Sequence, residues 1–170
     1  MKNLKKVLAL VLACTMVFGL VATASTGYPD VADDATYAEA VKTLSALKIL
    51  QGDENGNFNP DATITRAEMA KILCTMVKSG ELAPTATKFA DVAADHWAGG
   101  YIAYAQQLGY IDGYDATTFG PEDPVTYEQV VKLIMAALNY TYVAEQNGGY
   151  PTGYLFAAAD VDVTKGVSIT

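Results

Sequence analysis

The chain is poor in the residues on which most enzymatic and metal sites depend. Its 170 residues include one histidine, His96, and two cysteines, Cys14 and Cys74. Cys14 lies in the apolar N-terminal run, so no disulfide framework or cysteine zinc site can be built from the remainder. Nucleophile motifs, metal-spaced histidines and a glycine-rich phosphate loop are also missing from the sequence. We therefore expect a protein that is not an enzyme and that uses no metal and no cofactor.

Positive charge is scarce as well. Arg66 is the only arginine, and three lysines fall within the first six residues. Residues 25–170 keep 8 basic against 19 acidic residues, a net charge of −11. Such a surface repels nucleic acid and anionic membranes, so we expect neither as a partner. It also works against acidic polymers, although salt screens charges that lie more than about 8–10 Å apart.

The N-terminus has the pattern of an export signal. Lys2, Lys5 and Lys6 precede an apolar run over residues 7–21, and the small residues Ala22-Thr23-Ala24 follow it. The run is short for a membrane-spanning helix, which needs about 20 apolar residues. We therefore predict that residues 1–24 are a signal peptide cleaved after Ala24, and that the mature chain has no membrane contact. A retained N-terminal anchor is the alternative.

The rest of the chain is an internal duplication. Residues 28–77 align without a gap with residues 89–138 at a constant offset of 61. A third repeat begins at an offset of 53 from the second. Its residues Gly153-Tyr154-Leu155 and Gly166 match Gly100-Tyr101-Ile102 and Gly113. The organisation predicted is a repeat over 28–78, a linker over 79–88, a second repeat over 89–138, a linker over 139–149 and a partial third repeat over 150–170. Either the chain is a fragment or its last repeat is incomplete.

Each repeat has the pattern of a helix, a loop and a second helix. Apolar residues recur at helical spacing in four stretches: Tyr37, Ala40, Val41, Leu44 and Leu47; Met69, Ile72, Leu73 and Met76; Trp97, Tyr101, Ile102, Ala105 and Leu108; and Val130, Leu133, Ile134 and Ala137. Gly52 comes just past the first stretch and suits a left-handed helix stop, with Gly113 as its counterpart. Nothing in the pattern suggests a sheet, so we predict an all-α fold.

The second helix of each repeat opens with a capping box. Thr65 precedes Glu68 by three residues, and Thr126 precedes Gln129 by the same spacing. In such a box the threonine side-chain oxygen accepts a hydrogen bond from the backbone N–H of the residue three positions later. The side chain of that residue accepts a hydrogen bond from the backbone N–H of the threonine. We assign these four residues a structural role.

The ordered motifs resemble those of the S-layer homology domain. The first repeat has Tyr28-Pro29-Asp30-Val31, Gly52-Asp53, Phe58-Asn59-Pro60 and Ile64-Thr65-Arg66-Ala67-Glu68. The second has Phe89-Ala90-Asp91-Val92, His96-Trp97, Gly113-Tyr114 and Phe119-Gly120-Pro121. The resemblance covers almost all of residues 25–170. It implies tandem helix-loop-helix repeats packed as a pseudo-threefold helical bundle.

The resemblance also implies a function. Members of this family attach exported proteins to the bacterial cell wall by binding secondary cell-wall polysaccharide, commonly acidic and pyruvylated, in grooves between repeats. Arg66 matches the arginine that contacts the ligand, and a guanidinium holds a carboxylate with two parallel hydrogen bonds. Trp97, Tyr114 and Tyr127 offer rings on which sugars could stack. We expect the protein at the cell surface, in the wall or surface layer.

Other interpretations of these residues stay open. Arg66 could be an ordinary solvated side chain, Trp97 could pack in the core, and His96 could help to start a helix. The second repeat has Tyr127 where the arginine belongs, so one groove alone could accept an acidic ligand. Asp53, Asn55 and Asn57 hint at a calcium loop, but Phe58 and Ile64 stand where its glycine and bidentate glutamate belong. The alternative function is a structural protein that self-assembles into a surface layer or fibre through its repeats.

Overall fold

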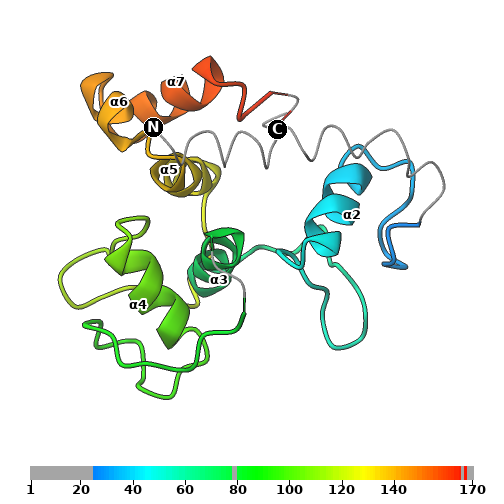
Figure 1. The fold of residues 1–170 in the computed structure, drawn as a ribbon, viewed down its shortest axis with the longest axis horizontal. Helices are drawn as coiled ribbons and strands as arrows, with labels where there is room; N and C mark the ends of the chain where they lie inside the picture. Colours follow the sequence, from blue (N-terminus) through cyan, green and yellow to red (C-terminus); the bar gives the residue numbers. More distant parts are fainter. Residues whose placement is uncertain (1–24, 78–79, 166, 168–170) are drawn as a thin grey trace. The chain divides into compact units, whose positions relative to one another are not determined.

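A computed structural model describes residues 25–77, 80–165 and 167, so the predicted signal peptide and Gly166 lie outside the described residues. The described part is helical, as the sequence predicts, and its strand pairing is limited to one isolated bridge between Thr65 and Pro124. Figure 1 shows the helices, which are α2 (Ala38–Ala46), α3 (Arg66–Val77), α4 (Gly99–Gln107), α5 (Tyr127–Ala137), α6 (Thr141–Gln146) and α7 (Thr152–Asp160). The described residues form two compact units, which divide between residues 62 and 63.

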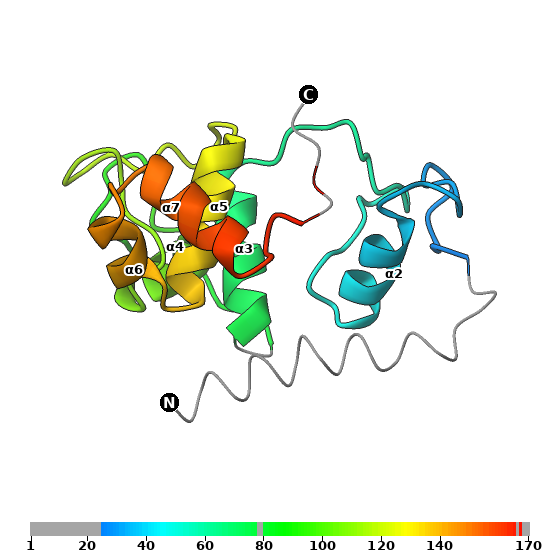
Figure 2. The ribbon, with the colours of Figure 1, turned by 90° about the horizontal axis from the view of Figure 1, so that it is seen from above.

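The first unit contains α2 and the loop that follows it. In Figure 2 the chain leaves α2, turns and comes back beside the helix. A contact between two aromatic rings stabilises this loop, because the ring centroids of Tyr28 and Phe58 lie 5.4 Å apart. The Asp30 carboxylate fixes the loop by accepting the N–H groups of Phe58 at 2.9 Å and Asn59 at 2.6 Å.

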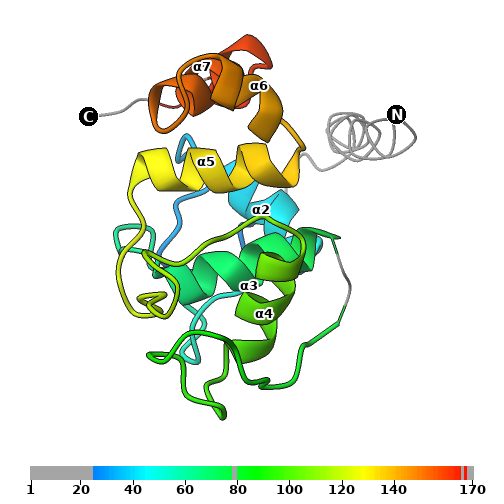
Figure 3. The ribbon, with the colours of Figure 1, turned by 90° about the vertical axis from the view of Figure 1, so that its left-hand side faces the viewer.

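The second unit contains the other five described helices, of which α3 packs against α4 and α5, and α5 packs against α6 and α7. Figure 3 shows α3 and α5 near the middle, with α4 beside α3 and with α6 and α7 beyond α5. Between α3 and α4 lies a core that includes Ala67, Ala70, Leu73, Ile102 and Ala105, none of them more than 1% exposed. A second core joins α5 to α6 and α7 through Val131, Met135, Ala144, Tyr154 and Ala157. The second helix of one repeat therefore covers the first helix of the next.

The helix starts follow the capping pattern in the sequence. Thr65 Oγ1 accepts the Glu68 N–H at 3.2 Å, and Glu68 Oε2 accepts the Thr65 N–H at 2.7 Å. Thr126 and Gln129 make the same reciprocal pair at 3.4 and 3.2 Å. Each box satisfies two amides that the first turn would otherwise leave without a partner.

The helix stop predicted at Gly52 is wrong. The left-handed residue after α2 is Lys48, with φ of 57°, and its counterpart after α4 is Gly109, with φ of 73°. Gly52 is needed for close approach instead, because a Cβ there would lie 2.7 Å from the Asn57 carbonyl oxygen and 2.6 Å from the Tyr28 ring. Gly113 is equally crowded, with the Phe89 ring at 2.5 Å from a Cβ.

The predicted apolar stripes are too long at their ends. Leu47 and Leu108, which close the first helix of each repeat in the sequence pattern, are the C-caps of α2 and α4 and stay exposed. Trp97 lies one residue before the N-cap of α4 and is 45% exposed, so its interpretation as a core residue is wrong. The segment 139–149, predicted as a linker, contains α6.

Candidate functional site

The site lies where the start of α3 meets the loop of the second repeat. Residues 64–67 run antiparallel to residues 121–125 and exchange backbone hydrogen bonds with them. The N–H groups of Arg66 and Ala67 donate to the carbonyls of Asp123 and Pro121, both at 2.9 Å, and Val125 N–H donates to Ile64 at 3.0 Å. The Thr65–Pro124 bridge belongs to the same contact. Two repeats are therefore joined at the first turn of α3.

Arg66 extends this junction with its side chain. Its Nε donates to the Phe119 carbonyl at 2.7 Å, and its Nη2 donates to the Asp112 carbonyl at 2.9 Å. These bonds cross 53 and 46 residues of sequence, so Arg66 is not an ordinary solvated arginine. A guanidinium has five N–H donors, and these two bonds use two of them. The others remain for a ligand or for water.

Two aromatic rings lie over the guanidinium. Its Cζ is 4.5 Å from the centroid of Tyr114 and 4.6 Å from that of Phe119. Both distances suit a cation–π contact, which holds the charged plane in one orientation. Phe119 is buried, whereas Tyr114 is 54% exposed, so one ring supports the site and the other presents a free face.

The charges around Arg66 are mixed. Burial lowers the pKa of Arg66, while Tyr114 and the carboxylates of Asp123 and Asp91 act in the opposite direction. Burial and a hydrogen bond to the Asp123 side chain raise the pKa of Tyr114. The neutral Tyr114 hydroxyl donates a hydrogen bond to the Asp123 carboxylate. This carboxylate, which lies near the Arg66 guanidinium, therefore has a hydrogen-bond partner of its own.

Asp91 shapes the loop that carries Tyr114 and Phe119. Its carboxylate accepts the N–H groups of Phe119 at 2.9 Å and Gly120 at 2.6 Å. Burial raises the pKa of Asp91, but these hydrogen bonds outweigh it, and the pKa is lowered overall. Asp30 holds the equivalent loop of the first repeat in the same way. The aspartate of each repeat's opening motif is thus a loop clamp.

Trp97 reaches the same loop through its neighbour. His96 Nδ1 accepts the Ala98 N–H at 3.1 Å, which places His96 at the start of α4, and His96 Nε2 lies 3.2 Å from Glu122 Oε1. The Trp97 ring stacks on His96 with centroids 5.8 Å apart. It is a second exposed ring, connected to the loop through the contact of His96 with Glu122, but the rings that lie over the guanidinium are those of Tyr114 and Phe119.

Tyr127 occupies a different place. It is the first residue of α5 and packs against the core of α5, α6 and α7. It corresponds to Arg66 in the repeat alignment, but the structure does not bring it to Arg66 or Tyr114. Of the four candidate ligand residues, Arg66 and Tyr114 are in direct contact, and Trp97 is linked to their loop through His96. Within the described part of the chain, Tyr127 makes no hydrogen bond or ring contact with any of them.

Sequence reasoning missed the main partners of Arg66. The carbonyls of Asp112 and Phe119 and the carboxylate of Asp123 all belong to the other repeat. A backbone carbonyl leaves no trace in residue identity. The sequence does single out Phe119, because it aligns with Phe58 of the first repeat at the offset of 61.

The duplication is also detected by comparison with known proteins. The S-layer homology domain matches residues 27–70 and 88–131, which together make up more than half of the chain. The chain belongs to the S-layer homology family. Both matched segments run from the opening aromatic motif to the first half of a repeat's second helix, so the matched segments supply both sides of the Arg66 site.

Relatives of the chain are surface proteins. It is 35% identical over 176 residues to a cell surface protein of Thermoanaerobacter kivui, an alignment covering 99% of this chain and 22% of that protein. A middle cell wall protein of Brevibacillus brevis is 30% identical over 173 residues, with coverages of 98% and 16%. A cellulosome-anchoring protein of Acetivibrio thermocellus is 33% identical over 115 residues, with coverages of 65% and 26%. The chain thus spans about a quarter or less of these relatives.

Family and relatives agree with the expected location, which is outside the cell at the bacterial surface. Among the described helices, none combines the length and the apolar character needed to cross a bilayer.

Proposed function

We propose that residues 25–170 anchor an exported protein to the bacterial cell wall by binding an acidic wall polysaccharide at the Arg66 site. The observation that carries the proposal is the fixed guanidinium of Arg66 beneath the half-exposed ring of Tyr114. The two carbonyl bonds position the guanidinium before any ligand arrives, which reduces the entropy lost on binding. The name of the cellulosome-anchoring relative fits the same role.

The chemistry of the site favours a sugar that carries a carboxylate, such as a pyruvylated one. The free N–H donors of Arg66 suit a carboxylate, and the exposed face of Tyr114 suits the apolar side of a pyranose ring. Trp97, at the start of α4, adds a second exposed ring, which stacks on His96. The position of Tyr127 leaves it out of this site, so we propose Arg66, Tyr114 and Trp97 as the ligand contacts. The module has no catalytic role in this proposal.

The test is co-sedimentation of residues 25–170 with purified walls before and after polysaccharide extraction. We expect binding that disappears with the polysaccharide and weakens in Tyr114→Ala, which removes the exposed ring and leaves the carbonyl bonds of Arg66 intact. Tyr142→Ala is the matched control, because Tyr142 is a 76% exposed tyrosine on α6. Equal binding by Tyr114→Ala and Tyr142→Ala, or undiminished binding to extracted walls, would contradict the proposal.

A further inference from the structure

Asp123 lies beside Arg66 and is fixed there by its backbone. Its carbonyl accepts the Arg66 N–H at 2.9 Å, and its own N–H donates to the Gly120 carbonyl at 3.2 Å. The residue is exposed, and together with Asp91 its carboxylate acts on the charge of the guanidinium. The role of Arg66 and Tyr114 as ligand contacts leaves this carboxylate without a function.

Gly120 allows the Asp123 side chain to reach Tyr114. Its backbone is left-handed, with φ of 71°. A Cβ at Gly120 would collide with Asp123 Oδ2 and would lie 2.6 Å from Tyr114 Cε2. The missing side chain therefore leaves room for the carboxylate and the ring to meet over the loop. Since the same ring lies over the Arg66 guanidinium, the second repeat presents a cation, a ring face and an exposed acceptor next to one another.

The equivalent loop of the first repeat has a different set of side chains. At the offset of 61, Tyr114, Gly120 and Asp123 are replaced in the first repeat by Asp53, Asn59 and Ala62. Asn59 keeps the left-handed backbone, with φ of 57°, and its Nδ2 donates to Asp53 Oδ2 at 3.0 Å. These two side chains satisfy each other, and the alanine offers no acceptor. The exposed acceptor beside a cation therefore belongs to the second repeat.

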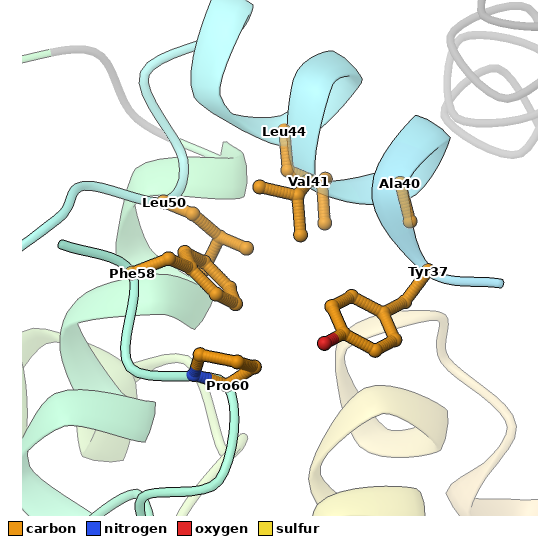
Figure 4. Close-up of a pocket in the computed structure, with 7 residues that line it drawn as sticks. All are labelled: Tyr37, Ala40, Val41, Leu44, Leu50, Phe58 and Pro60. Atoms are coloured by element: carbon orange, nitrogen blue, oxygen red, sulfur yellow. The ribbon is translucent and has the colours of Figure 1, made fainter. Parts of the chain in front are cut away.

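The apolar groove of the first unit does not supply these groups. Figure 4 shows this groove, which encloses about 270 Å³ between α2 and the loop that follows it. It is lined by Tyr37, Ala40, Val41, Leu44, Leu50, Phe58 and Pro60. The Tyr37 hydroxyl is the one polar group among these side chains, so the groove has no charge with which to hold an acidic sugar.

The balance of charge at Arg66 indicates what the Asp123 carboxylate selects. One positive charge faces the two carboxylates of Asp91 and Asp123, so the site attracts a bare anion only weakly. A carboxylate has about four lone-pair positions for hydrogen bonds, and the Tyr114 hydroxyl uses one of those of Asp123. The others can accept hydroxyl or amide N–H groups of a ligand. A sugar carries such donors close to its own carboxylate.

We propose that Asp123 is a specificity-determining residue of the Arg66 site and accepts hydrogen bonds from hydroxyl or amide groups of the acidic sugar that Arg66 holds. This inference rests on the proposed function, and it narrows the ligand class to acidic sugars with free donors near the carboxylate. A sugar whose hydroxyl groups are blocked gains nothing from Asp123 and meets only its negative charge. Loss of Asp123 should therefore weaken binding of the free sugar and strengthen binding of the blocked one.

The test uses methyl glucuronoside and its 2,3,4-tri-O-methyl derivative, which share the carboxylate and the ring but differ in hydroxyl groups. Each is titrated into residues 25–170, and binding is followed through the amide chemical shifts of Tyr114 and Gly120. We expect the original chain to bind the free sugar about fivefold more tightly, the size expected for one net hydrogen bond. Asp123→Ala should abolish this preference. The variant should fold, because Ala62 stands at the same place in the first repeat.

Asp160→Ala is the matched control, because it removes the same charge from an exposed residue at the end of α7. It should bind both sugars as the original chain does. Four results would overturn the proposal: equal affinities for the two sugars in the original chain, equal weakening of both in Asp123→Ala, the same changes in Asp160→Ala, or no saturable shifts with either sugar.

Wall binding measured on the same chains keeps this inference apart from the proposed function. A chain that prefers the free sugar but is not retained by walls contradicts the anchoring role. A chain that walls retain, and in which Asp123→Ala leaves the preference unchanged, contradicts only the role of Asp123.

Discussion

Arg66 and Phe119 belong to different repeats, and a hydrogen bond of 2.7 Å joins the Nε of the first to the carbonyl of the second. The same guanidinium donates to Asp112 and lies under two rings. The residue proposed to bind the wall therefore also ties the repeats together. Binding and stability have to be measured separately for any variant at this position.

Arg66→Ala should destabilise the folded chain as well as weaken wall binding. It leaves two carbonyls without their donor, and a typical hydrogen bond contributes about 0.5–1.5 kcal/mol, the range that suits one part-buried and one exposed bond. We expect the free energy of unfolding in urea to fall by about 2 kcal/mol for the two bonds together. Tyr114→Ala should lower it by less, about 1 kcal/mol, because it removes a half-exposed cation–π contact and leaves both carbonyl bonds of Arg66 in place. Equal stability of the two variants would mean that the carbonyl bonds contribute little.

Asp91→Asn should alter the response to acid. The pKa of Asp91 is lowered in the folded chain from 3.8, so its contribution to stability is present above that value and is lost as the pH falls through the lowered pKa. The variant should be less stable at neutral pH, and the difference from the original chain should narrow below pH 3.8. Thermal unfolding followed by circular dichroism between neutral pH and pH 2 measures this. A difference that is constant with pH would contradict the loop-clamp role.

Gly113→Ala should be strongly destabilising. The added Cβ would lie 2.5 Å from the Phe89 ring and 2.7 Å from the Asp115 carbonyl oxygen, so the ring and the loop backbone must shift. Overpacking of this kind costs about 1–3 kcal/mol. Ala116→Gly, on the exposed part of the same loop, serves as the control in chemical unfolding. A Gly113→Ala chain as stable as the original would show that the loop can relax around the new atom.

Leu73→Ala and Leu108→Ala separate the real core from the predicted one. Leu73 is 0% exposed in the core between α3 and α4, whereas Leu108 is 38% exposed at the end of α4. Truncating a buried leucine costs about 2–5 kcal/mol, and we expect an exposed one to cost under about 1 kcal/mol. Urea unfolding of both variants gives the comparison. Similar losses would mean that Leu108 is covered in solution.

Much of the fold is encoded locally. The 61-residue duplication, the helical spacing of apolar residues and the two capping boxes predict the existence, type and starts of the second helices. These features depend on neighbouring residues and need no knowledge of the tertiary structure. The helix ends are less well predicted, because Lys48 and not Gly52 adopts the left-handed conformation. A lysine there costs little enough for the surrounding structure to impose it.

What the sequence by itself determined is the family, the all-α class and the choice of Arg66 and Tyr114 as candidate ligand residues, since residue types at fixed spacing carry that information. Only the tertiary structure decided which repeat supplies each side of the site. The carbonyls that orient Arg66 belong to Asp112 and Phe119, which lie 46 and 53 positions further along the chain. Every residue has a backbone carbonyl, so the residue type does not show which carbonyl will accept a hydrogen bond. It also decided that Trp97 is exposed, because burial depends on which helix of another repeat covers a residue.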